Sequence, residues 1–402
     1  MRGITGFLYS MVWTLSTLYF VQKAGLTPLQ LVLIGTCLET FVFIFEIPTG
    51  IVADLYSRKL SVIIGFVLIG LGFIIQGTLP YFGAILLAQA LWGIGYTFTS
   101  GADSAWIADE LGEERVGTVF LRGSQASQVG ALLGIGASVV LANFGLVLPI
   151  VAGGVTFLAL ALFLALFMPE TGFKPTPQED RNSWQAMGST FKDGVKAIRL
   201  SPSLITLLVI GLFYGLSSEG IDWLWQVHVI DLFPSTLAMS ITTWFGIISA
   251  VTMVLSIALV QLLTKKLDLK NFRGIGTLLV WGNAAFVLSI AAFALAGNFT
   301  MAIACYLSLA LLRRLNGPLH QAWLNRNIPS QVRATVLSMG GQVDSLGQII
   351  GGPIIGIVAT HFSVASAILL AAVILTPIPF LFARAKGHEV KLPADVIVGS
   401  TT

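Results

Sequence analysis

Charged side chains are scarce in this chain of 402 residues: Asp, Glu, Lys and Arg make up only 10% of it, whereas hydrophobic residues make up 55%. Soluble domains carry about 25% charged residues. So few charges cannot cover a surface that faces water, which excludes an ordinary soluble domain and predicts that the chain sits in lipid. The formal net charge of +3 is small, so we expect no nucleic-acid partner.

Cysteine is almost absent as well. Cys37 and Cys305 are the two in the chain, and both fall inside apolar runs, where we interpret them as packing residues rather than as a disulfide or metal site. The sequence also lacks a Gly-x-x-x-x-Gly-Lys-Ser/Thr loop, a His-Glu-x-x-His pair and a nucleophile motif with a suitable base. These absences exclude a process driven directly by ATP hydrolysis and disfavour an enzyme. We also expect no metal and no cofactor.

Long apolar runs are what the chain does have. Runs of about 20 residues are long enough to cross a hydrocarbon core of roughly 30 Å as helices. Because the backbone in lipid must satisfy its own hydrogen bonds, and because these runs do not alternate with period two, we expect helices rather than barrel strands. Twelve runs lie at residues 3–21, 30–53, 61–79, 83–107, 118–142, 146–168, 203–230, 236–263, 275–296, 300–325, 335–360 and 363–384.

The positive charges predict the orientation of these helices. With the N-terminus inside, all but three of the 22 Lys and Arg residues fall on the cytoplasmic side. The exceptions are Lys23, which falls outside, and Arg313 and Arg314, which lie within a run. This pattern follows the positive-inside rule and predicts a multi-pass protein with both termini in the cytoplasm.

A polar, proline-containing stretch at residues 169–202 divides six runs from six. We therefore predict an N-terminal bundle at 1–168, a cytoplasmic linker, a C-terminal bundle at 203–385 and a cytoplasmic tail at 386–402. The glycine pair Gly130 and Gly134 recurs 217 residues later as the pair Gly347 and Gly351. Small residues at this spacing let helices approach closely, and their recurrence favours an internal repeat.

The segment GIVADLYSRK, residues 50–59, joins the end of the second run to the third. It matches the loop motif Gly-x-x-x-Asp-x-x-Gly/Ser-Arg-Lys, and with twelve runs the whole chain resembles the major facilitator superfamily. The resemblance implies an all-α membrane protein of two pseudo-symmetric six-helix bundles. EIPTG, SSEGIDWLWQVH and IPSQVRATVLSMGGQ are further similar to bacterial tetracycline and macrolide efflux facilitators, which implies the bacterial inner membrane. Gln89 departs from the Arg that proton-driven exporters usually carry there.

In this family the loop works as a cytoplasmic latch, and its acid and bases grip the neighbouring bundle. The acids of ADELGEER, at the inner end of the fourth run, offer partners for Arg58 and Lys59. The alternative is that these charges are solvated and only set the topology. The predicted gate residues are Gly50, Asp54, Arg58, Lys59, Asp109, Glu110, Arg115 and Asp344.

Ionisable residues inside the runs are functional candidates, because each costs at least about 2.5–3.5 kcal/mol at mid-depth. The proton-coupling candidates are Glu46, Asp103, Glu219 and Asp222. Two interpretations of the seventh and tenth runs stay open: Arg313 or Arg314 pairs permanently with an acid and holds two helices together, or the acid exchanges Arg for a proton during transport. Glu46 is alternatively a protonated acid bonded to Asp103 or Gln89.

Aromatic and polar residues in the runs suit a flat, partly apolar ligand. Trp223 and Trp225, near the expected outer end, are typical of interfacial anchors, and a histidine such as His320 is more typical of packing than of proton transfer. The predicted substrate-binding residues are Arg313, Arg314, Gln89, Trp92, Tyr96, Tyr214, Gln226 and His320.

These features favour a monomeric secondary transporter that works by alternating access, with a small molecule, protons and the lipid bilayer as partners. The surplus of acids favours proton-coupled efflux of amphipathic small molecules or drugs. Uptake of an organic anion, clamped by Arg313 or Arg314, is the alternative. A channel or a non-transporting sensor is a rival of another class.

Overall fold

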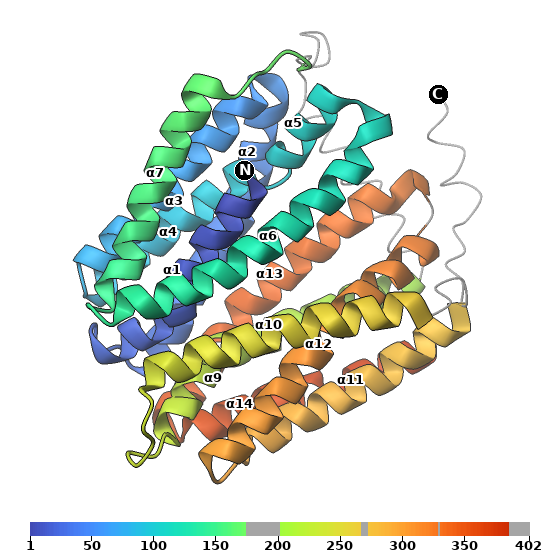
Figure 1. Ribbon diagram of the computed structural model, residues 1–402. Helices are drawn as coiled ribbons and strands as arrows, with labels where there is room; N and C mark the ends of the chain where they lie inside the picture. The colour runs from blue at the N-terminus through green and yellow to red at the C-terminus, as the bar shows by residue number, and fades with distance from the viewer. Residues whose placement is uncertain (174–201, 267–271, 329, 386–402) are drawn as a thin grey trace. The chain divides into compact units, whose positions relative to one another are not determined.

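The computed structural model describes residues 1–173, 202–266, 272–328 and 330–385 (Figure 1). Most of the predicted linker 169–202 and the predicted tail 386–402 lie outside these residues. The described residues form helices joined by turns and no strand, which confirms the all-α prediction. The helices are α1 (Arg2–Gln22), α2 (Pro28–Leu55), α3 (Arg58–Thr78), α4 (Phe82–Thr99), α5 (Ala102–Leu111), α6 (Glu113–Ala142), α7 (Val147–Phe167), α9 (Pro202–Asp231), α10 (Ile241–Lys266), α11 (Phe272–Ala294), α12 (Phe299–Asn327), α13 (Ser330–His361), α14 (Val364–Leu375) and α15 (Pro377–Ala385).

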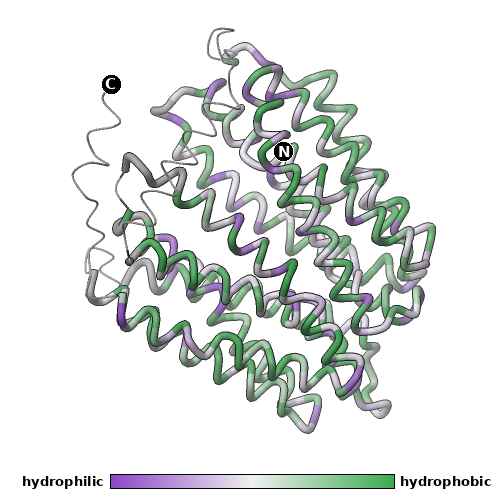
Figure 2. Tube along the Cα trace, turned by 180° about the vertical axis from the view of Figure 1, so that it is seen from behind, coloured by the Kyte–Doolittle hydropathy of each residue, from purple (hydrophilic) through white to green (hydrophobic). Residues whose placement is uncertain are grey.

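Eleven helical segments of the described chain are long and apolar enough to cross a membrane, with α4 joined to α5 and α14 joined to α15. The tenth predicted run, 300–325, forms α12, which is long enough but is more polar than the others because it carries Arg313, Arg314, Asn316 and His320. Figure 2 shows hydrophobic residues along most of the long helices, interrupted by a few hydrophilic positions. The twelve-helix prediction is confirmed, and α12 is the polar member of the set.

Two runs predicted as continuous helices are broken. The run 83–107 is interrupted between α4 and α5, where Gly101 has a φ of 75°, a conformation that glycine adopts without strain. The run 363–384 is interrupted after α14, where Pro377 begins α15. Proline has no N–H to donate to the preceding turn and disfavours helical geometry in the residue before it.

The chain divides into two compact units, Met1–Arg181 with Ser235–Ala250 and Asn182–Pro234 with Val251–Thr402. In the first unit α1 packs on α6, and α3 packs on α4 and α7. In the second unit α9 packs on α13, and α11 packs on α12, α14 and α15. In each unit the first spanning helix therefore packs on the fifth, which is α6 or α13, and the third packs on the fourth and the sixth. An internal repeat requires this agreement.

The recurring glycine pairs lie where α6 meets α1 and where α13 meets α9. A Cβ added at Gly134 in α6 would collide with the backbone of Phe7 in α1, and one at Gly351 in α13 would collide with the backbone of Leu216 in α9. Gly130 and Gly347 make the matching contacts one turn earlier. The predicted close approach of these helices is therefore present in both units.

Candidate functional site

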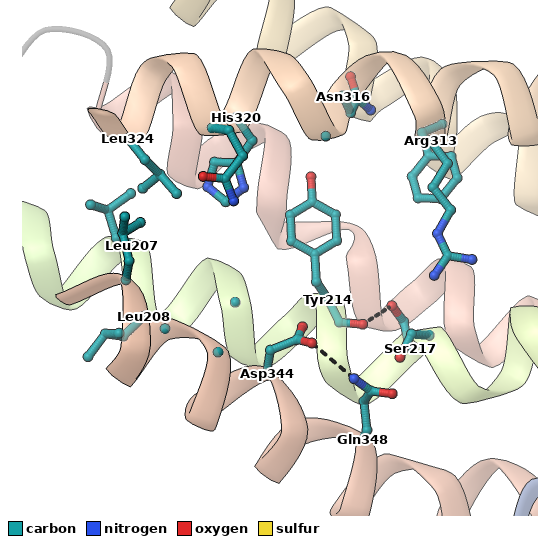
Figure 3. A pocket seen from close by; sticks show the side chains of 18 of the residues that line it. Leu207, Leu208, Tyr214, Ser217, Arg313, Asn316, His320, Leu324, Asp344 and Gln348 are labelled. Carbon is teal, nitrogen blue, oxygen red and sulfur yellow. Dashed lines mark hydrogen bonds between the residues drawn. The ribbon is translucent and has the colours of Figure 1, made fainter. Parts of the chain in front are cut away.

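A cavity of about 650 Å³ lies inside the second unit, between α9, α12 and α13. Apolar side chains such as Leu207, Leu208 and Leu324 line one part of it (Figure 3). Its polar residues come from three different helices. They are Tyr214, Ser217, Ser218, Asp222, Arg313, Asn316, His320, Gln321, Asp344 and Gln348. An apolar cavity with a few convergent polar groups is the usual form of a small-molecule site.

An ion pair between α9 and α12 forms part of the wall of this cavity. Arg313 donates two hydrogen bonds to Asp222, from Nη1 to Oδ1 and from Nη2 to Oδ2, the second at 2.8 Å. The side chains are 42% and 46% exposed, so the pair faces open space rather than a packed interior. Glu219, the other acid predicted on this helix, is only 3% exposed and is not among the residues that line the cavity.

A polar network fixes the aromatic wall of the same cavity. The Tyr214 hydroxyl donates to Oδ1 of Asn283, which also accepts a 3.5 Å hydrogen bond from Asn316 Nδ2. In Figure 3 the Tyr214 ring points from α9 toward α12. The His320 ring lies 6.0 Å from Tyr214 and 5.5 Å from Phe382. Its Nε2 is buried and has no hydrogen-bond partner among the described residues. The sequence analysis missed Asn283, although an amide inside an apolar run was a usable signal.

A second cavity, of about 340 Å³, adjoins the same ion pair. Asp222, Arg313 and Arg314 are its charged lining residues. Trp225 and Tyr306 also line it, with their rings stacked at 4.0 Å and 15°. Trp225 therefore packs on α12 beside a cavity, and its assignment as an interfacial anchor stays a prediction.

In the first unit, Glu46 lies beside the break between α4 and α5. Its Oε1 accepts a 3.0 Å hydrogen bond from Ser100 Oγ, in place of the predicted bond to Asp103 or Gln89. Asp103 instead pairs with Arg2 at 3.4 Å. The two partners are 101 residues apart in the chain, and no local spacing could have predicted their meeting.

The other predicted residues of the first unit form an aromatic group and a buried pair. Trp92 stacks on Tyr96 at 5.6 Å, and Trp13 meets the Trp92 ring edge-on at the same distance. Gln89 is fully buried and donates to Gln76 at 2.7 Å. Gln89 therefore packs inside its unit, as does the 3% exposed Gln226 inside the second unit.

The loop between α2 and α3 is held by ion pairs and by the segment after α7. Arg58 Nη1 lies 2.5 Å from Asp109 Oδ2 and Nη2 lies 4.0 Å from Asp54 Oδ1. Glu170 accepts from Ser57 Oγ at 2.7 Å and from the Lys59 backbone N–H at 2.8 Å. The sequence analysis missed Glu170, whose signal was an acid directly after an apolar run and Pro169.

The remaining predicted gate residues lie in different surroundings and do not form one cluster. Glu110 accepts hydrogen bonds from the backbone N–H groups of Thr171 and Gly172, which ties the segment after α7 to α5. A Cβ added at Gly50 would meet no described atom within 4 Å. Arg115 has no ion pair among the described residues. Asp344 lines the cavity of the second unit, so its assignment to the gate stays a prediction.

The two acids beside Arg58 should differ in their effect on stability. Asp109→Asn removes a close, mostly buried ion pair and should lower the free energy of unfolding by about 1–3 kcal/mol. Asp54→Asn should cost less than about 1 kcal/mol, because Asp54 is 67% exposed and 4.0 Å from Arg58. Thermal unfolding in detergent would compare them. A larger loss for Asp54→Asn would show that Asp54 has a stronger partner than Arg58.

A family model described as the Major Facilitator Superfamily matches residues 1–312. The chain belongs to the major facilitator superfamily. Members of this superfamily are transporters and not enzymes, so the protein is a multi-pass membrane transporter that binds small-molecule substrates. The prediction made from the loop motif is confirmed.

Two relatives from Bacillus subtilis (strain 168) and several solved structures resemble this transporter. The uncharacterized MFS-type transporter YxaM is 24% identical over 93% of this chain and 91% of its own, and Multidrug resistance protein 2 is 25% identical over 76% and 73%. The nucleoside transporter NupG has a TM-score of 0.77 at 16% identity, covering 96% of this chain and 98% of its own. A bacterial homolog of the human lysosomal transporter Spinster has 0.76 at 14%, covering 98% and 97%. At these identities the structures show the fold alone.

Proposed function

We propose that this transporter exports amphipathic small molecules in exchange for protons by alternating access. The observation that carries the proposal is the Asp222–Arg313 ion pair, which is exposed to two cavities in the middle of spanning helices. A carboxylate that loses its Arg partner in a cavity can take up a proton, and one that regains the partner can release it. The similarity to Multidrug resistance protein 2 supports export.

The sites in the first unit complete this proposal. Glu46 beside Ser100, at the break after α4, offers a second carboxylate for protonation. The aromatic group of Trp92 and Tyr96 offers flat apolar surface for a substrate. The loop residues around Arg58 form the latch at the end of the helices that the positive charges assign to the cytoplasm.

A second candidate is proton-coupled uptake of an organic anion. The observation that favours it is the exposure of Arg313 together with the position of Arg314 in the smaller cavity. Two guanidinium groups lining one cavity would hold a carboxylate or phosphate by charge-assisted hydrogen bonds. In this mechanism the anion displaces Asp222 from Arg313, and Asp222 then takes the proton.

The two candidates differ in the direction of proton movement. Purified protein would be reconstituted into vesicles that enclose a pH dye, and lipophilic cations and organic anions would be added in turn. Proton release driven by a cation supports export, whereas proton entry together with an anion supports uptake. Vesicles without protein and vesicles carrying Asp222→Asn are the controls. No proton movement with any of these compounds or with a zwitterion of similar size would overturn proton coupling.

The loop residues give a separate test of alternating access. Asp54→Asn should slow substrate exchange several-fold without changing which compounds are carried, because the latch controls the change of state and not the cavity. Initial rates and competition profiles in the same vesicles would show this. An unchanged rate would refute the role of Asp54 as a latch.

A further inference from the structure

The two cavities of the second unit meet at one ion pair and differ in the sign of their remaining charge. Ile221, Asp222 and Arg313 line both of them. Because Asp222 and Arg313 neutralise each other, the other charged residues decide the balance. These are Asp344 in the larger cavity and Arg314 in the smaller one. The larger cavity therefore has one surplus negative charge and the smaller cavity one surplus positive charge.

Neither surplus charge is neutralised within the described part of the protein. Asp344 Oδ2 accepts a 3.0 Å hydrogen bond from the neutral amide of Gln348, and no base lies within ion-pair distance of it among the described residues. Arg314 also has no ion pair among those residues. We count His320 as neutral, because a charge on its buried, unpartnered Nε2 would be costly, and Asp344 as ionised, because its side chain is only part-buried and accepts a hydrogen bond from Gln348.

We propose that the two cavities form one site for an amphipathic zwitterion, a molecule with an ammonium group, a carboxylate and an apolar body. This inference rests on the proposed transport function. The ammonium lies against Asp344 and the carboxylate against Arg314, each in a charge-assisted contact. The apolar body lies along the leucine-lined part of the larger cavity, and the stacked rings of Trp225 and Tyr306 flank the carboxylate end.

A zwitterion satisfies both charges at once, which a singly charged compound cannot do. A cation would pair with Asp344 and leave Arg314 without a partner, and an anion would do the reverse. A ligand that fills both cavities displaces water from both charges, so a charge that it leaves unpaired carries a desolvation cost. The arrangement therefore selects against both classes of singly charged compound and for molecules that carry both charges.

The test uses three probes with one apolar body: naphthylalanine, naphthylethylamine and naphthylpropionate. Their dissociation constants would be measured by calorimetry with the full chain in lipid nanodiscs. We expect naphthylalanine to bind about tenfold or more tightly than either singly charged probe. Equal affinity for all three, tighter binding of a singly charged probe, or no binding of any probe would overturn the proposal.

Two variants test which residue binds the ammonium group of the probe and which binds its carboxylate. Asp344→Asn should weaken the binding of naphthylalanine and naphthylethylamine and strengthen that of naphthylpropionate, which then leaves no unpaired carboxylate. Arg314→Gln should weaken the binding of naphthylalanine and naphthylpropionate and strengthen that of naphthylethylamine. Asp344→Glu should restore the amine preference, which separates charge from folding. Asp231→Asn, on the same helix as Asp222 but outside both cavities, is the matched control. An equal loss for every probe in both variants would indicate a structural role and refute the site.

Binding and transport are measured separately, so the two proposals fail differently. If the zwitterion binds as expected but moves no protons in vesicles, proton-coupled transport is refuted and the site stands. If cations or anions drive proton movement while the zwitterion neither binds preferentially nor is carried, the transport function stands and the zwitterion site is refuted.

Discussion

Asp222→Asn should reduce proton-coupled transport to near background in vesicles. The change removes the charge on one partner of a two-point ion pair and leaves Arg313 without a carboxylate. Hydrogen bonds to charged groups contribute about 1.5–3 kcal/mol each. The rate of proton-coupled transport is therefore expected to fall roughly tenfold to 100-fold. The loss should appear in proton movement, because the asparagine cannot take up and release a proton.

Matched variants decide whether this pair is structural or part of the transport cycle. Asp222→Asn combined with Arg313→Gln removes both charges and should recover the thermal stability that either single change loses, while transport stays lost. Glu219→Gln changes the neighbouring acid on α9, which is 3% exposed and outside the cavities. We expect it to lower coupling less than Asp222→Asn does. Full proton-coupled transport by a folded Asp222→Asn protein would remove Asp222 from the mechanism.

The sequence could predict the fold because lipid leaves few choices. Scarce charge and repeated apolar runs required spanning helices, and the glycine pairs predicted close helix contacts at α6 and α13, although not that α1 and α9 are the partners. The break at Gly101 could not be predicted in the same way. Glycine is common inside spanning helices, and the residue alone does not reveal a positive φ.

The candidate site could be predicted where the directions of two spanning helices place their residues at the same depth in the membrane. Antiparallel runs placed Asp222 and Arg313 at similar depth, and the structure pairs them. Which face of a helix a residue occupies was harder to predict. Glu219 lies three residues from Asp222 and should share its face, yet it is buried while Asp222 lines the cavities. Gln89 looked like a cavity residue, but its amide is occupied by Gln76 from another helix.

Gly351→Ala should destabilise the protein by about 1–3 kcal/mol. A Cβ at this position meets the backbone of Leu216 in α9, and a backbone cannot move aside as the end of a flexible side chain can. Helices in lipid gain no hydrophobic driving force from pairing, so they depend on close packing of this kind. Gly134→Ala meets the backbone of Phe7 in α1 and should cost a similar amount. Thermal unfolding in detergent measures both.

Two other glycines serve as controls for these substitutions. A Cβ at Gly136 in α6 or at Gly340 in α13 meets no described atom within 4 Å. Alanine there should be neutral or stabilising by up to about 1 kcal/mol, because alanine is the better helix former. If all four variants unfolded alike, the close contacts would not determine stability. Matching losses at Gly134 and Gly351 would instead show that both halves of the repeat depend on the same helix pair, the first with the fifth.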